Sequence, residues 1–296
     1  MEKQFILTAI LPLNMYWKSV KLKNEKSKDK KSPMGRNFMN KNKFLFFIII
    51  LIMNLKCSPP TTPLIIGHRG AKGHVAENTL PSVSKAIELG VDGIEVDVFL
   101  CKSGELVVFH DKTLQKLTDG MGFIEDLTLD SIQKINVLGN YKIPTLKEVI
   151  DLIQGKVFLN IELKGNGTAL PTHELLKTYL KEGYWNANQF IISSFNWDEL
   201  KHFYELNKEV PIAVLTDADP LDALPIAKTV QAKAINPSFK SLTVKNVKKI
   251  QQAGIKIFPY TINKNEDIKK MLVLNVDGII TDYPERVKQV MFSLNE

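Results

Sequence analysis

The chain has 296 residues, 44% of them hydrophobic, and a formal net charge of +7. The positive charge is concentrated at one end, because residues 1–43 contain eleven Lys or Arg and three Asp or Glu, which leaves the rest of the chain at −1. A near-neutral body gives no electrostatic reason to expect nucleic-acid binding, and only two cysteines argue against a structural disulfide.

The first predicted element is a short apolar segment after the basic residues. Phe44–Met53 (FLFFIIILIM) holds ten apolar residues without a charge, whereas a membrane-spanning helix needs about 20 and a secretory signal about 7 to 15. We therefore predict that residues 1–56 are a basic leader and signal segment. Met39 begins a compact signal, so translation is expected to start there or at Met34. A long disordered basic leader is the alternative.

A cysteine, Cys57, follows the signal segment and precedes the Pro- and Thr-rich run SPPTTP. We interpret residues 57–62 as a semi-rigid tether. The order of apolar segment, cysteine and polar linker resembles the signal of bacterial lipoproteins, in which that cysteine is acylated. We expect a lipid on Cys57 and a location in a bacterial cell envelope, either membrane-anchored or periplasmic to extracellular. Because Lys56 fits the lipoprotein signal poorly, an uncleaved anchor is the alternative.

From residue 62 onward, short β-branched runs alternate with helical periodicity. In the first helix Asn78 is expected to be the N-cap and Gly90 to end it, and TLKEVIDLIQG opens with a capping box of Thr145 and Glu148. The predicted strands are Leu64–Gly67, Gly93–Val98, Val157–Leu163, Phe190–Ser194, Ile212–Leu215, Ala232–Ile235, Lys256–Ile262 and Gly278–Thr281.

Eight strand and helix cycles in about 235 residues favour a closed (β/α)8 barrel, the TIM barrel of the α/β class, over an open doubly wound sheet. No G-x-G-x-x-G follows the first strand, which further disfavours a dinucleotide-binding fold. We assign residues 63–296 to one barrel domain.

The run ELVVFHD does not fit this cycle, because it begins only a CKSG turn after the second strand. So short a connection excludes a parallel crossover and predicts a β-hairpin. If the turn centres on Lys102 and Ser103, Glu95 lies opposite His110, which brings a histidine beside the carboxylates of that strand. Residues 112–143 are predicted to be a small insertion over the mouth of the barrel.

Charged residues lie at the carboxyl ends of the predicted strands, where TIM barrels build their active sites. Glu95 and Asp97 are i and i+2 on a strand, so both point to the barrel interior. With Glu162 they form an all-oxygen set, which suits a hard divalent ion such as Mg²⁺ or Ca²⁺. We therefore predict a metal site at these three residues. Salt bridges from them to Arg69 and Lys164 are the structural alternative.

Two cations and two imidazoles accompany the carboxylates. Arg69 follows the first strand and Lys164 the third, and both are suited to phosphate oxygens. His68 and His110 titrate near neutral pH and suit a general acid and a general base. A divalent ion with these four groups is typical of phosphodiester cleavage.

Eight motifs follow one another in the order GHRG, AENT, GIEVDV, VVFHD, IPTLKEV, NIELKG, SSF and NVDGIITDYP. This set resembles the glycerophosphodiester phosphodiesterase family from about Pro63 to the C-terminus. The resemblance implies a TIM barrel with a small insertion that hydrolyses deacylated phospholipids to an alcohol and glycerol 3-phosphate. It further implies an acid and base at His68 and His110, metal ligands at Glu95, Asp97 and Glu162, phosphate contacts from Arg69 and Lys164, and a place in the site region for Glu77.

Two departures from the family pattern bear on the pocket. Ala76 replaces the usual Pro of PENT, which is expected only to loosen a loop. Tyr260, in YTIN, stands where the family usually has Trp in WTVN, which leaves the headgroup preference open. Tyr260 and Phe195 are expected to form walls of the site, with core packing as the alternative.

Two other functions remain as alternatives at this point. One is a phospholipase of the phosphatidylinositol-specific or sphingomyelinase D type, which would need an apolar rim or docking helix that the sequence does not present. The other is a lipoprotein that binds glycerophosphodiesters without cleaving them. Such a protein would be expected to lose His68 or His110, and both are present.

Overall fold

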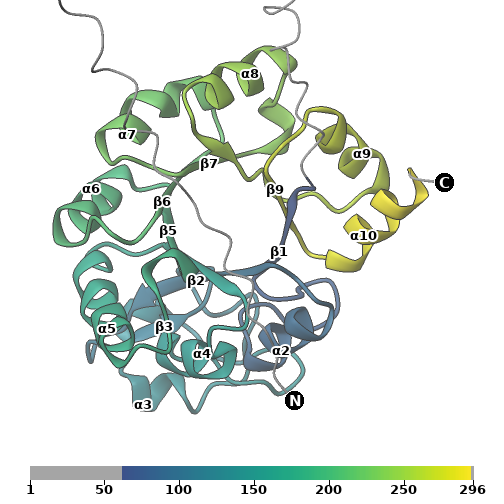
Figure 1. The fold of residues 1–296 in the computed structure, drawn as a ribbon. Helices are drawn as coiled ribbons and strands as arrows, with labels where there is room; N and C mark the ends of the chain where they lie inside the picture. Colours follow the sequence, from purple (N-terminus) through teal and green to yellow (C-terminus); the bar gives the residue numbers. More distant parts are fainter. Residues whose placement is uncertain (1–61, 295–296) are drawn as a thin grey trace, which may run out of the picture. The chain divides into compact units, whose positions relative to one another are not determined.

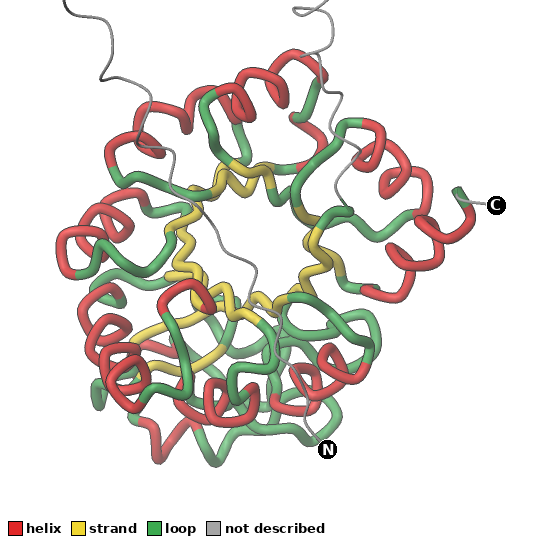
Figure 2. The backbone as a smooth tube through the Cα atoms, viewed as in Figure 1, coloured by secondary structure: helices red, strands yellow, loops and turns green. Residues whose placement is uncertain are grey.

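Parallel strands line the centre of the structure, a computed structural model that describes residues 62–294 (Figures 1 and 2). The predictions for the leader, Cys57 and most of the tether lie outside the described residues. Eight strands follow one another around the ring in the order β8-β7-β6-β5-β4-β2-β1-β9. They are β1 (Leu64–His68), β2 (Gly93–Leu100), β4 (Phe158–Leu163), β5 (Phe190–Ser194), β6 (Ile212–Thr216), β7 (Ala234–Pro237), β8 (Lys256–Ile257) and β9 (Gly278–Thr281).

Helices surround the ring of strands (Figure 2). They are α2 (Leu80–Glu88), α4 (Leu146–Ile153), α5 (Ala169–Glu182), α6 (Trp197–Leu206), α7 (Leu224–Thr229), α8 (Val244–Gln252), α9 (Asn265–Val273) and α10 (Pro284–Ser293). The alternation of parallel strands and helices confirms the predicted TIM barrel. Among the described residues, no helix is long and apolar enough to cross a membrane.

The barrel closes between β8 and β9 through loop-like backbone. Asp277 N donates to Ile257 O at 3.1 Å, and Ile280 N donates to Pro259 O at 3.0 Å. The predicted strand Lys256–Ile262 is therefore much shorter as a regular element, because Pro259 has no N–H to donate toward β9. The strand predicted at Ala232–Ile235 is also shifted, since β7 occupies Ala234–Pro237.

Alternation along the strands separates the apolar core from the barrel interior. In β2, Ile94, Val96 and Val98 belong to the large buried cluster that packs against the helices. Glu95 and Asp97 alternate with them and are buried on the opposite side. The apolar pattern of the strand therefore directs its two carboxylates inward.

The helix caps confirm one prediction and correct another. The Thr145 side chain accepts from Glu148 N while the Glu148 side chain accepts from Thr145 N, which is the predicted capping box. The N-cap of α2 is Thr79 and not Asn78, because the Thr79 side chain accepts from Ser82 N. The Asn78 side chain instead donates to Asp97 Oδ2 at 2.8 Å.

The predicted hairpin is present, but its register was wrong by one residue. Strand β3 (Leu106–Val108) pairs antiparallel with β2, and Val98 lies opposite Val108. Glu95 is therefore not opposite His110. The turn is longer than predicted because Gly104 has φ 99°, a left-handed conformation that glycine adopts readily.

The segment 112–143 contains the short 3-10 helix η1 (Ile124–Asp126) and the short helix α3 (Leu129–Ile132). It has an apolar cluster separate from the barrel core, in which Leu114, Ile124 and Ile132 are fully buried. Residues Phe99 and Val107 of the hairpin belong to the same cluster. The insertion and the hairpin arm thus pack as one apolar unit.

Candidate active site

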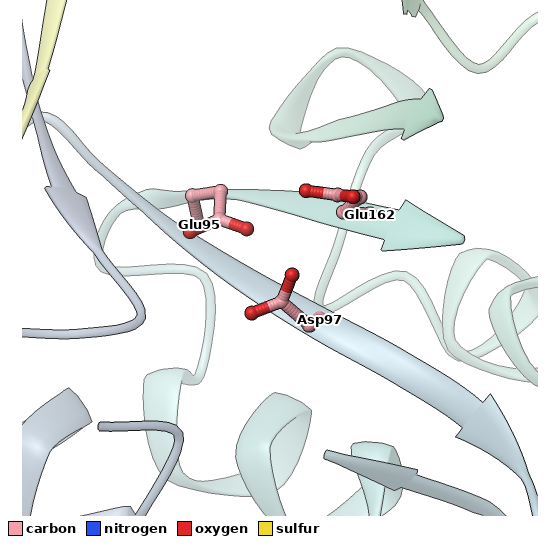
Figure 3. Close-up of side chains that lie close together, drawn as sticks. All are labelled: Glu95, Asp97 and Glu162. Atoms are coloured by element: carbon pink, nitrogen blue, oxygen red, sulfur yellow. The ribbon is translucent and has the colours of Figure 1, made fainter. Parts of the chain in front are cut away.

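The register of three neighbouring strands brings the predicted carboxylates together. His68 of β1 lies beside Glu95 of β2, and Asp97 lies beside Glu162 of β4. Side chains at matched positions of parallel strands point to the same face of the sheet. The strands therefore present all three carboxylates at one place in the barrel, as Figure 3 shows.

The carboxylates of Glu95, Asp97 and Glu162 form a compact, buried cluster. One oxygen from each lies within 4.8 Å of the others, and the three residues are only 4%, 1% and 8% exposed. Glu95 Oε1 and Asp97 Oδ1 are buried without a hydrogen-bond partner. Buried carboxylate oxygens without partners are unfavourable unless a cation binds them. The donor set, all oxygen and triply acidic, fits a hard divalent ion.

The electrostatics of the cluster agree with this reading. Burial, together with the nearby carboxylates of Asp97 and Glu162, raises the pKa of Glu95 well above its ordinary value. Burial and the charge of Asp97 raise the pKa of Glu162 to about 8. Like charges that are buried together resist ionisation unless a cation offsets them.

The GHRG motif forms a sharp turn at the end of β1. Arg69 has φ 51° and Gly70 has φ 83°, and a side chain at Gly70 would collide with the backbone of Ser82. The turn lets Arg69 N donate to Glu95 Oε2 at 2.9 Å. Arg69 thus adopts a left-handed backbone conformation, which is uncommon and strained for a residue other than glycine. Such strain often occurs at functional sites.

The Arg69 side chain crosses the site between two acids. Its Nε lies 3.2 Å from Asp97 Oδ2, and its Nη1 donates to Glu77 Oε1. Glu77 also pairs with Lys72 at 2.9 Å. Glu77 therefore positions Arg69, which agrees with its predicted place in the site region.

Asp97 stays ionised despite its burial. Burial opposes its ionisation, but nearby cations, Arg69 foremost, outweigh this effect and lower its pKa. Asn78 contributes a hydrogen bond from Nδ2 to Asp97 Oδ2 at 2.8 Å. Lys164 Nζ lies 3.8 Å from Asp97 and 2.9 Å from Glu162. The predicted alternative of salt bridges is thus partly realised, yet Glu95 Oε1 and Asp97 Oδ1 accept no hydrogen bond.

His68 is oriented by an aspartate, Asp282, that was not among the predicted site residues. Its Nδ1 lies 2.6 Å from Asp282 Oδ1, and a carboxylate can only accept, so Nδ1 carries the proton and Nε2 is free. Nε2 lies 4.0 Å from Glu95 Oε2. Burial lowers the pKa of His68, and the bond to Asp282 opposes that shift only in part. The neutral imidazole therefore has a free nitrogen for accepting a proton.

His110 lines the same pocket as His68 and lies beside Lys164. Phe109 N donates to Asp97 O at 3.0 Å and so holds this stretch against the end of β2. His110 Nδ1 lies 2.5 Å from Asp111 Oδ1, and Nε2 lies 3.3 Å from Lys164 Nζ. Burial lowers its pKa as well. The predicted histidine therefore reaches the site although the predicted hairpin register was wrong.

A pocket of about 360 Å³ opens beside these groups. Phe195 and Tyr260 line it, as predicted, and their rings contact edge to face with centroids 5.9 Å apart. The predicted site residues in its lining are His68, Arg69, Glu95, His110, Glu162, Lys164, Phe195 and Tyr260. Asp97 and Glu77 lie behind this lining, where each contacts Arg69.

Three supporting residues, Asp282, Asn78 and Asp111, were not among the site residues predicted from the sequence, whereas Asn263 was expected at the end of the strand before β9. Asp282 and Asn263 form a chain behind His68, because Asn263 Nδ2 donates to Asp282 Oδ2 at 2.7 Å. Asn78 holds Asp97, and Asp111 holds His110. Asp282 directly follows β9, so the rule used for the other strand ends, applied to the last strand, would have found it.

Comparisons with known proteins agree with this geometry. The glycerophosphoryl diester phosphodiesterase family matches residues 68–286. A glycerophosphodiester phosphodiesterase from Caldanaerobacter subterraneus subsp. tengcongensis is 38% identical over 231 residues, which cover 75% of this chain and 95% of that protein. Another, from Bacillus subtilis, is 31% identical over 261 residues, covering 78% of this chain and 87% of that protein.

A solved structure is also similar. A phosphodiesterase from Oleispira antarctica, in complex with the product sn-glycerol-3-phosphate, aligns with a TM-score of 0.72 at 29% identity, covering 78% of this chain and 97% of that one. The family match spans more than half of the chain and includes both histidines and all three carboxylates. The chain therefore belongs to the glycerophosphoryl diester phosphodiesterase family.

Proposed function

We propose that this protein hydrolyses glycerophosphodiesters to an alcohol and glycerol 3-phosphate with the help of a divalent metal and two histidines. The observation that carries the proposal is the buried cluster of Glu95, Asp97 and Glu162, in which two oxygens accept no hydrogen bond, beside the pocket that His68 and His110 line. The product complex of the Oleispira antarctica relative supports the substrate class.

The three carboxylates would hold Mg²⁺ or Ca²⁺. When bound, such an ion polarises phosphoryl oxygens and offsets the charge that develops on them. Arg69 and Lys164 line the same pocket and can donate to the phosphoryl oxygens directly. The phosphate is therefore expected to lie between these two cations and the carboxylate cluster.

The glycerol hydroxyl next to the phosphate ester is the proposed nucleophile. His68 accepts the proton of this hydroxyl at Nε2, its oxygen attacks phosphorus, and the bond from phosphorus to the leaving alcohol breaks. His110, protonated at Nε2, gives that proton to the departing oxygen and becomes neutral. Water then opens the resulting cyclic phosphate, with the two histidines exchanging roles, to give glycerol 3-phosphate. Each proton transfer of this kind contributes about 10² to 10⁴ in rate.

The test is release of glycerol 3-phosphate from glycerophosphocholine by the purified protein with Mg²⁺ or Ca²⁺. Turnover supports the proposal, and binding without turnover would identify a binding protein instead. Intact phosphatidylcholine in mixed micelles is the control, because a phospholipase would cleave it. A glycerophosphodiester with hydrogen in place of the neighbouring hydroxyl should bind without turnover. Cleavage of that analogue at a comparable rate would favour direct attack by water.

We further propose that the protein works in a bacterial cell envelope, attached through Cys57. The proposal is supported by the apolar segment Phe44–Met53 that precedes this cysteine. The full chain expressed in a bacterium should enter the detergent phase, and Cys57→Ser should move it to the aqueous phase or leave a larger precursor. An intact bond between Lys56 and Cys57 in the mature protein, seen by mass spectrometry, would contradict lipidation.

A further inference from the structure

The pocket has a second end that the proposed chemistry does not use. Phe195, Asp217 and Tyr260 line it, together with Leu215 and Thr261. Phe195 is 41% exposed, which is high for a phenylalanine, because aromatic residues are usually more deeply buried. The exposed Phe195 ring therefore offers an apolar surface on which part of a ligand can pack.

Asp217 and Tyr260 are joined at this end. Tyr260 Oη donates to Asp217 Oδ1 at 2.8 Å and lies 3.1 Å from Thr216 O. Burial, with the nearby Asp217, raises the pKa of Tyr260, so the phenol keeps its proton. The bond engages one oxygen of Asp217 and fixes the Tyr260 ring beside Phe195. Phe195, Tyr260 and Asp217 are therefore held together by direct contacts before a ligand binds.

The negative charge of Asp217 is not neutralised by the protein. Among residues 62–294, no Lys, Arg or His nitrogen lies within 4.0 Å of its carboxylate, whereas Glu77, Asp97 and Glu162 at the catalytic end each have a Lys or Arg partner. Asp217 is exposed, so it stays hydrated until a ligand arrives. An unpaired carboxylate beside two aromatic rings is the arrangement that attracts organic cations.

The two ends of the pocket offer different charged groups to a ligand. Lys164, a predicted phosphate contact, lies 5.8 Å from the centre of the Phe195 ring. The Phe195 ring contacts Tyr260, and Tyr260 contacts Asp217. A ligand that extends from the phosphate site across the aromatic pair thus passes from the cations Arg69 and Lys164 to the carboxylate of Asp217. This pattern is complementary to a zwitterion with a phosphate at one end and an ammonium group at the other.

We propose that Phe195, Tyr260 and Asp217 form a subsite for the cationic headgroup of the substrate, so that the enzyme prefers glycerophosphocholine and glycerophosphoethanolamine to diesters with neutral headgroups. The inference rests on the proposed function and names the substrate class of the same site. A neutral polyol would also find hydrogen-bond acceptors here, but it would gain nothing from the unpaired charge or from cation–π contact.

The first experiment compares kcat/KM for glycerophosphocholine with kcat/KM for glycerophosphoglycerol, which has the neutral headgroup. In Asp217→Asn the ratio should fall about tenfold, because the amide keeps an oxygen for Tyr260 but removes the charge. In Phe195→Leu the ratio should fall by about two- to fivefold. Asp222→Asn is the matched control, since Asp222 is exposed in the same loop region but does not line the pocket, and its ratio should not change.

The second experiment uses the unmodified enzyme and so does not depend on how a variant folds. Choline should inhibit hydrolysis more strongly than 3,3-dimethylbutan-1-ol, in which a carbon replaces the charged nitrogen. Equal inhibition by the two, or an unchanged substrate ratio in Asp217→Asn, would overturn the subsite while leaving the phosphodiesterase activity in place. An enzyme that hydrolyses neither diester would overturn the proposed function, and this inference with it.

Discussion

Each of the two histidines is paired at Nδ1 with an aspartate from a nearby loop position. Asp282 follows β9 and holds His68, whereas Asp111 is the direct neighbour of His110. Since carboxylates only accept hydrogen bonds, Nδ1 carries a proton in both pairs, and Nε2 is the nitrogen that can exchange one. Nε2 of His110 lies 3.3 Å from Lys164 Nζ. With His68 neutral and His110 protonated at Nε2, the first imidazole can take a proton and the second can give one to a bound phosphodiester.

We expect His68→Ala and His110→Ala each to lower kcat/KM by at least about 100-fold, because each variant loses a proton transfer. His202→Ala, on an exposed position of α6, is the control and should keep full activity. Circular dichroism should show that all three variants are folded. Either active-site variant with more than a tenth of normal activity would argue against a proton-transfer role.

The role of Asp282 in positioning His68 can be tested by measuring how kcat/KM depends on pH in Asp282→Asn. His68 must be neutral to accept a proton, so kcat/KM falls as the pH falls through its pKa. Burial lowers that pKa below 6.5, and the Asp282 carboxylate partly raises it again. Removal of the carboxylate should therefore shift the acidic limb of the profile to lower pH and reduce kcat. A limb that stays in place, or moves to higher pH, would contradict the pairing.

At the level of elements, the hairpin and the insertion depend on each other. Phe99 and Val107 of the hairpin share a buried cluster with Leu114, Ile124 and Ile132 of the insertion. Ile124 N also donates to Lys112 O at 3.0 Å, two residues after His110. The insertion therefore stabilises the segment that carries one of the two histidines.

Ile124→Ala should lower the free energy of unfolding by about 2–5 kcal/mol, because it removes a fully buried side chain and leaves a cavity. Met121→Ala, at a position that is 77% exposed in the same insertion, should change it by less than about 0.5 kcal/mol. Urea unfolding followed by circular dichroism measures both. Equal effects of the two substitutions would show that the insertion has no core of its own.

At the level of the whole molecule, the proposed metal binding by the carboxylate cluster would affect stability. Three buried carboxylates destabilise the metal-free protein through mutual repulsion, and a ligand that binds only the folded state stabilises it by mass action. Because the cluster joins β2 to β4, its stabilisation is transmitted to the barrel itself. Metal binding should therefore be visible without any assay of activity.

EDTA should abolish activity, and Mg²⁺ or Ca²⁺ at about 100 times its dissociation constant should raise Tm by roughly 5–10 °C. Glu95→Gln should lose both the activity and the rise in Tm. Its Tm without metal should match or exceed that of the unmodified protein, since glutamine resembles the protonated form that burial favours. Full activity after exhaustive chelation would contradict a metal requirement.

Much of the fold and of the site could be predicted from local sequence. Eight β-branched runs at regular spacing indicated the barrel, because each buried parallel strand needs an apolar face toward a helix. The spacing of Glu95 and Asp97 placed both carboxylates inside, because side chains alternate along a strand. The capping box at Thr145 and Glu148 was equally predictable, since it depends only on residues three apart.

Tertiary structure alone decided what depends on contacts distant in sequence. The left-handed Gly104 adds one residue to the hairpin turn, so the strand register could not be predicted by assuming a two-residue turn. Asn78 appeared to be a helix cap but bonds Asp97, because the turn at Arg69 brings it there. The sequence by itself determined which groups would meet at the strand ends. Only the closed barrel decided how they are oriented, because it brings Asp282 to His68 across 214 residues and Asp217 to Tyr260 across 43.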